Sequence, residues 1–300
     1  MTTTATPTSP ATASLTPNPS TGSAAYDRHG SGALAGPRRQ TLRRAMAVEW
    51  IKIRTLRSTW VGMGSVILML VGFGALAAAM TTGSVEGPAD GGGPFGAGDP
   101  VSTVLTGANF AVLLVGVMGS LSGAREYSSR MIVATVTAVP RRWHVVVSKA
   151  VVFGAVTAVT ALVGVLGAFW LGMAVLSGSD ADTVVLSDDG VLREILGMAG
   201  YIAAIGLIGL GLGIVLRSVA GSISVVVAAV MVVPTLAGVM LPSSWDALLK
   251  YLPSSAGAAF TTVQGAGTEV LATGAGAGVL VAWVIATLAG AIVSIKRRDV

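Results

Sequence analysis

The chain has 300 residues, of which 53% are hydrophobic and only 11% are charged, and it contains no cysteine. Soluble domains have about a quarter of their residues charged, so this composition argues against the alternative of a soluble helical protein. The lack of cysteine excludes disulfides, thiol catalysis and cysteine-ligated metal sites. The formal net charge of +5 raises the question of which partner the basic residues face.

Residues 1–37 differ in composition from the rest of the chain. They are rich in Thr, Ser, Pro and Ala and have almost no large apolar side chain. Such a segment cannot bury a core, so we expect a disordered cytoplasmic tail, either dispensable or with a regulatory or docking role. It lacks the basic start and the apolar run of a signal peptide.

Residues 38–59 are predicted to form a basic amphipathic helix before the first apolar stretch. An apolar stripe would be formed by Leu42, Met46, Trp50, Ile53 and Trp60. Basic residues are mostly displaced from this stripe, which is typical of a helix lying among inner-leaflet headgroups, in contact with membrane lipids. The candidate residues of this interfacial helix are Glu49, Trp50, Lys52, Arg54 and Arg57. Either the helix is only a positively charged anchor, or it also docks a cytoplasmic partner.

Six apolar stretches without an ionisable residue follow. They lie near 60–80, 101–121, 150–176, 195–216, 218–241 and 271–295. Roughly 20 apolar residues in a helix cross the ~30 Å hydrocarbon core of a bilayer. The sequence therefore predicts an all-α integral membrane protein, with six transmembrane helices in a single domain over 38–300.

The charged residues orient these spans. With the N-terminus in the cytoplasm, all but two of the 19 lysines and arginines fall on the cytoplasmic side, and most of the 14 acidic residues fall outside. Because basic segments resist translocation, both termini are expected to be cytoplasmic. The basic charge then reflects topology in the plasma membrane, and no nucleic-acid partner is expected.

Motifs for energy conversion are missing from the sequence. It contains no GxxxxGK[ST] phosphate loop, no HExxH and no GxSxG. Proton- and ion-coupled transporters usually have ionisable groups inside their spans. Asn109, the most polar mid-span residue, is expected to form an interhelical hydrogen bond. We therefore expect a membrane subunit that binds no cofactor and has no energy source of its own.

The segment 122–149 has a distinct order of features. Glu126 is followed by a small-residue turn, a short apolar stretch over 131–139, Pro140-Arg141, and Lys149 at the start of the third span. This order resembles the membrane subunits of type-2 ATP-binding-cassette (ABC) transporters, of the exporter-like permease class. The stretch 49–58 is also similar to the one that precedes span 1 in many such permeases, so the resemblance covers roughly 40–300.

The resemblance implies that 122–149 is a cytoplasmic coupling loop seated in a groove of a separate ABC ATPase, which would bind ATP and Mg²⁺. It also implies a second permease subunit, giving a homo- or heterodimer. The residues that would couple to the ATPase are Glu126, Tyr127, Arg130, Pro140, Arg141 and Arg142. Ser128-Ser129-Arg130 stands where the family often has Gly-Thr, so the turn differs locally. Alternatively, Arg141, Arg142 and Lys149 are only basic residues flanking a span.

Two further patterns concern packing. A short external helix with Trp245, Leu248, Leu249 and Leu252 on one face, ending at Pro253, is expected to lie in or re-enter the outer leaflet. The GxxxG pairs Gly119/Gly123, Gly209/Gly213 and Gly274/Gly278 predict close helix contacts.

These patterns favour a permease that works with a separate ATPase to export a lipophilic or amphipathic substrate. A non-catalytic membrane anchor, sensor or resistance subunit is the alternative, and a secondary transporter comes third.

Overall fold

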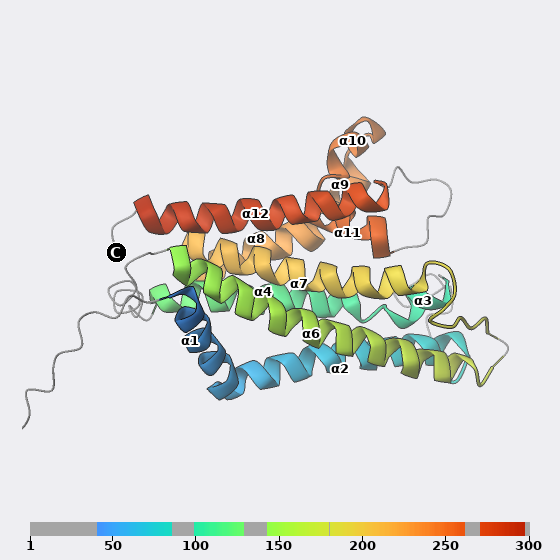
Figure 1. The fold of residues 1–300 in the computed structure, drawn as a ribbon. Coiled ribbons are helices and arrows are strands. Elements are labelled where there is room, and N and C mark those ends of the chain that lie inside the picture. Colours follow the sequence, from blue (N-terminus) through green and yellow to red (C-terminus); the bar gives the residue numbers. More distant parts are fainter. Residues whose placement is uncertain (1–40, 86–98, 129–142, 180, 262–270, 298–300) are drawn as a thin grey trace, which may run out of the picture. The chain divides into compact units, whose positions relative to one another are not determined.

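The computed structural model describes residues 41–85, 99–128, 143–179, 181–261 and 271–297 (Figure 1). The chain divides into two units, residues 1–39 and 40–300, and only the second contains described residues. The predicted tail over 1–37 and the apolar stretch over 131–139 lie outside the described residues. Within the described ranges every regular element is helical, without a strand.

Along the described segments the elements are α-helices, with one π turn and one 3₁₀ turn among them. Their bounds are α1 Leu42–Thr55, α2 Arg57–Thr81, α3 Pro100–Val104, α4 Ala108–Ser128, α6 Trp143–Leu176, α7 Val191–Leu216, α8 Val219–Val227, η1 Ala228–Val232, α9 Val233–Met240, η2 Ser243–Trp245, α10 Asp246–Leu249, α11 Pro253–Thr261 and α12 Thr273–Arg297.

Six helical segments in the described part of the chain are long and apolar enough to cross a membrane. They are Arg57–Thr81, Ala108–Arg125, Trp143–Leu176, Val191–Leu216, Val219–Ala237 and Thr273–Arg297. Each overlaps one of the six predicted stretches, which confirms an all-helical chain with a multi-pass membrane architecture. The segments lie side by side, and α1 runs across one end of them (Figure 1). We call this end the α1 end and the opposite one the α3 end.

The helix of the second span begins later than predicted, because the chain breaks between α3 and α4. Asp99 caps α3 by accepting a hydrogen bond from the Ser102 N–H at 3.3 Å, and a new helix begins at Ala108. At the break, Gly107 lies against the backbone of α2, where a Cβ would come within 2.6 Å of the Leu70 carbonyl oxygen. The stretch predicted near 101–121 therefore contains the short helix α3 and most of α4, with a turn between them.

The third span is longer than predicted. Helix α6 begins at Trp143 rather than near residue 150 and has 34 residues. At 1.5 Å per residue it is about 51 Å long, against a hydrocarbon core of ~30 Å. The same continuous helix therefore crosses the predicted span and extends beyond it at the α1 end.

The fifth span contains a wide turn. The N–H of Val233 donates to the carbonyl of Ala228, five residues back, which defines the π turn η1 between α8 and α9. Pro234 follows and has no N–H to donate, so an uninterrupted α-helical ladder is impossible here.

After the fifth span, the predicted short helix is divided into η2 and α10. Pro253, predicted to end this helix, is also the first residue of α11. At the first position of a helix, proline's missing N–H costs no helical hydrogen bond. Helix α11 packs closely: a Cβ at Gly257 would lie 2.6 Å from the Tyr201 ring, and a Cβ at Gly276 of α12 would lie 2.5 Å from the Cβ of Ala259.

Helices α4 and α7 touch through their backbones. A Cβ on Gly119 or Gly123 would collide with the backbone of α7, and a Cβ on Gly213 would lie 2.5 Å from the Ser120 carbonyl oxygen. The close packing predicted for Gly119/Gly123 and Gly209/Gly213 is confirmed. The prediction for Gly274/Gly278 was wrong among the described residues, because none of them lies within 4 Å of either Cβ position.

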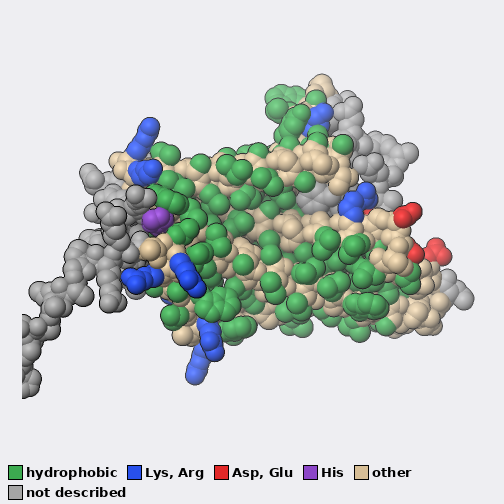
Figure 2. All heavy atoms as spheres, viewed as in Figure 1, with side chains coloured by type: hydrophobic (Ala, Val, Ile, Leu, Met, Phe, Trp, Pro, Cys, Tyr) green, Lys and Arg blue, Asp and Glu red, His purple; other side chains and the backbone are tan. Residues whose placement is uncertain are grey.

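Large apolar side chains cover the outside of the spans. Val159 is 62% exposed, Trp170 63% and Val239 82%. Figure 2 shows this hydrophobic surface between two charged ends, with most of the visible lysines and arginines at the α1 end and the visible acidic residues at the α3 end. A continuous apolar band of this kind suits contact with lipid rather than water.

Candidate functional site

The candidate site is the joint between α1 and the first turns of α6, at the α1 end of the spans. Ala45 and Glu49 form the buried face of α1, with Leu42 and Met46 half-buried beside them. By contrast, Trp50 is 52% exposed. The predicted apolar stripe is thus divided: Leu42 and Met46 are half-buried on the same side as the acidic residue Glu49, whereas Trp50 is exposed.

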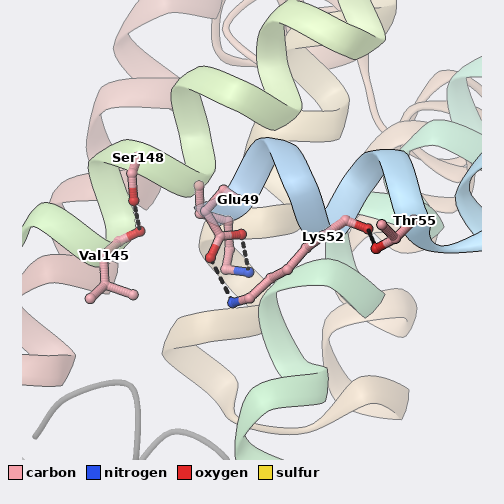
Figure 3. Close-up of polar contacts among 6 residues, drawn as sticks. Glu49, Lys52, Thr55, Val145 and Ser148 are labelled. Atoms are coloured by element: carbon pink, nitrogen blue, oxygen red, sulfur yellow. Dashed lines mark hydrogen bonds and ion pairs between the residues drawn. The ribbon is translucent and has the colours of Figure 1, made fainter. Parts of the chain in front are cut away.

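The joint is an ion triad centred on Glu49 (Figure 3). Its Oε1 accepts from Lys52 Nζ at 2.8 Å, one turn along α1, and its Oε2 accepts from Lys149 Nζ at 3.0 Å. The side chains of Glu49 and Lys149 are each 8% exposed, and that of Lys52 is 35% exposed. The contact joins two residues 100 positions apart in the sequence.

The charges of the triad determine where α1 lies along α6. Removing charges from water is costly, and the mutual attraction of a buried pair repays that cost only with good geometry. Here one carboxylate uses both oxygens on two ammonium groups, so a displacement of α1 along α6 would separate Glu49 from Lys149. The triad therefore favours one register of α1 on α6.

The elbow between α1 and α2 fixes the direction of α1. Leu56 takes an extended conformation between the two helices. Across the bend, Trp60 Nε1 donates to the Arg54 carbonyl at 3.0 Å, and the Thr59 N–H donates to the Leu56 carbonyl at 3.1 Å. These hydrogen bonds keep the chain ordered through the bend, so α1 is held at both of its connections, to α2 and to α6.

The predicted coupling residues lie next to this joint in the sequence. Glu126 and Tyr127 belong to the last turn of α4, although their side chains are not among those described. Arg130, Pro140, Arg141 and Arg142 lie outside the described residues. After the segment 129–142, α6 begins with Trp143 and His144, whose rings are 4.1 Å apart, and it reaches Lys149 within two turns.

The residues predicted for the interfacial helix separate into two groups. Glu49 and Lys52 belong to the triad, whereas Trp50, Arg54 and Arg57 are exposed. The sequence predicted Glu49 and Lys149 as separate features. Their pairing was missed, because no periodic pattern relates residues so far apart.

A second buried charge lies at the α3 end. Glu194 in the first turn of α7 is 3% exposed, with Oε1 3.9 Å from Nη2 of Arg193. The described helices therefore include Lys149 and Glu194, both beyond the charge-free stretches predicted from the sequence. Asn109 is exposed at the start of α4, so it forms no buried interhelical contact with the described residues.

Among the described residues, no group of three or more His, Cys, Asp or Glu side chains could hold a metal ion. No protein-family model matches the chain. A search of the curated proteins finds no relative.

Proposed function

We propose that the chain is the permease subunit of an ABC transporter, and that a separate cytoplasmic ATPase powers it. The observation that supports this most is the ion triad, which fastens the amphipathic helix α1 to the base of α6 directly after the segment 129–142. In the resembling permeases this segment receives the motion of the ATPase. The proposal explains why a helix outside the spans is joined so specifically to one of them.

The packing offers a route for this motion. Segment 129–142 lies between the end of α4 and the start of α6, so a rigid displacement there acts on both helices. Helix α4 is in backbone contact with α7 through Gly119 and Gly213, and α6 is joined to α1 through Lys149. A push on the loop would thus move α1, α4, α6 and α7 together.

The remaining parts of the proposal follow from charge and composition. The basic α1 end would face the cytoplasm at the plasma membrane, together with both termini, as the positive-inside rule favours. ATP and Mg²⁺ would bind to the partner ATPase. A second permease subunit would complete a path for a lipophilic or amphipathic substrate, with export as the expected direction.

Copurification of the full chain from native membranes in mild detergent tests this proposal. We expect an ABC ATPase to copurify with the wild type, and Arg141→Gln/Arg142→Gln to lose it at unchanged membrane abundance. The matched control is Lys296→Gln/Arg297→Gln, which removes the same charge at the exposed end of α12. The proposal fails if no ATPase copurifies with the wild type, or if the loop variant retains as much ATPase as the control.

A further inference from the structure

The side of α1 that faces away from α6 combines basic and apolar groups. Arg43, Arg54 and Arg57 are exposed, Trp50 is 52% exposed, Ile51 59% and Trp60 62%. We call these six residues of α1 and its elbow the outer face of α1. Basic side chains alternating with aromatic and aliphatic ones are typical of a surface at a membrane interface.

The triad makes this face purely cationic. Glu49 is the only acidic residue between positions 42 and 60. Glu49 is buried, and both of its carboxylate oxygens accept hydrogen bonds from lysines, so its negative charge does not lie on the outer face. What the outer face offers to a ligand is therefore the set of arginine guanidiniums, which bind phosphate oxygens bidentately.

The apolar part of this face is continuous with the spans. Trp60 is followed on α2 by Val61, 69% exposed, and by Leu68, 66% exposed. Along a spanning helix such a surface contacts acyl chains. A soluble partner would cover the arginines without covering α2, whereas a phospholipid contacts both, its headgroup at the arginines and its chains on α2.

We infer that the outer face of α1 binds anionic phospholipids of the inner leaflet. Their phosphates would contact Arg43, Arg54 and Arg57, and their acyl chains would lie against Trp50 and Trp60. This inference names a lipid class for the interfacial helix and does not require an ATPase, so it stands or falls separately from the proposed function.

The test is a titration of the purified full-length chain with phosphatidylglycerol and with phosphatidylcholine, followed by native mass spectrometry. Each surface arginine contributes about a fivefold change in affinity for an anionic lipid at low salt. We therefore expect Arg43→Gln/Arg54→Gln to weaken phosphatidylglycerol binding roughly 25-fold, with phosphatidylcholine binding unchanged. Both positions are exposed, so the variant should fold normally, which its melting temperature checks.

Lys296→Gln/Arg297→Gln is again the matched control, since it removes two charges from the last turn of α12, whose C-terminal end lies at the α1 end of the spans (Figure 1). It should leave the preference for phosphatidylglycerol intact. Equal losses in both variants, or equal wild-type affinities for the two lipids, would overturn the inference. The inference would also be overturned if Arg43→Gln/Arg54→Gln kept the lipid preference but no longer copurified with the ATPase, because the outer face would then bind the protein partner.

Discussion

Replacing Glu49 with Ala should destabilise the chain by about 3 kcal/mol, at the lower end of the range for breaking a buried ion pair. The substitution leaves the ammonium of Lys149, whose side chain is 8% exposed, without the carboxylate that now lies 3.0 Å away. The lower end is chosen because Lys52, the third member, is 35% exposed and admits water to the triad.

A double-mutant cycle isolates the pairwise contribution. The cycle consists of Glu49→Leu, Lys149→Met and the double variant. The double variant removes both charges and keeps apolar volume, so we expect its free energy of unfolding to lie within about 1 kcal/mol of the wild type. The coupling between the two positions should then exceed ~1.5 kcal/mol. Lys52→Met is the control: its partly exposed pair with Glu49 should cost less than about 1 kcal/mol.

The free energies come from reversible unfolding in mixed micelles, followed by circular dichroism, with limited proteolysis of α1 as a local measure of its release. Glu49→Ala should expose α1 to protease before the spans unfold. If Glu49→Ala changes stability by less than about 0.5 kcal/mol, or if the effects of the two single substitutions at 49 and 149 are additive, the triad does not hold α1 on α6.

Three further outcomes follow from the structure and the sequence. Gly119→Val should lower the free energy of unfolding by about 1–3 kcal/mol, because the added side chain overpacks the contact between α4 and α7. Gly278→Ala, with no described atom within 4 Å of its Cβ position, should be neutral or slightly stabilising. Thermal unfolding measures both, and equal effects would contradict the close contact. Glu126→Lys should abolish transport at matched membrane abundance, and wild-type transport would remove its coupling role. A reporter at Asp188 should be external and one at Trp143 cytoplasmic, and an external Trp143 would reverse the topology.

The sequence predicted the features that depend on composition and local periodicity. The six long apolar segments can be recognised from the sequence alone. A chain that crosses a membrane must form its backbone hydrogen bonds within a helix, so each span is one long apolar run. The contacts of Gly119 and Gly213 were also predictable, since small residues at helical spacing permit close approach. Gly274 shows the limit of this reasoning, because the same spacing occurs where no described residue packs against the glycine.

The contact between α1 and α6 could not be predicted from the sequence, because it depends on the tertiary fold. Glu49 lies within a basic amphipathic pattern, which gives no sign that this residue turns inward. Only the fold brings Lys149 within 3.0 Å of it. The break before α4 and the π turn at Ala228–Val232 were missed for a related reason: each is a backbone adjustment inside an apolar run, where hydropathy alone shows no boundary.

Reconstitution tests the central claim most directly. The purified chain would be placed in sealed vesicles with and without the copurifying ATPase, and the movement of a lipophilic dye across the membrane would be followed as ATP is added. We expect movement only with both proteins and ATP, no ATP hydrolysis by the chain alone, and loss of movement in Arg141→Gln/Arg142→Gln. Hydrolysis by the chain alone, or movement driven by an ion gradient without ATP, would contradict the proposal.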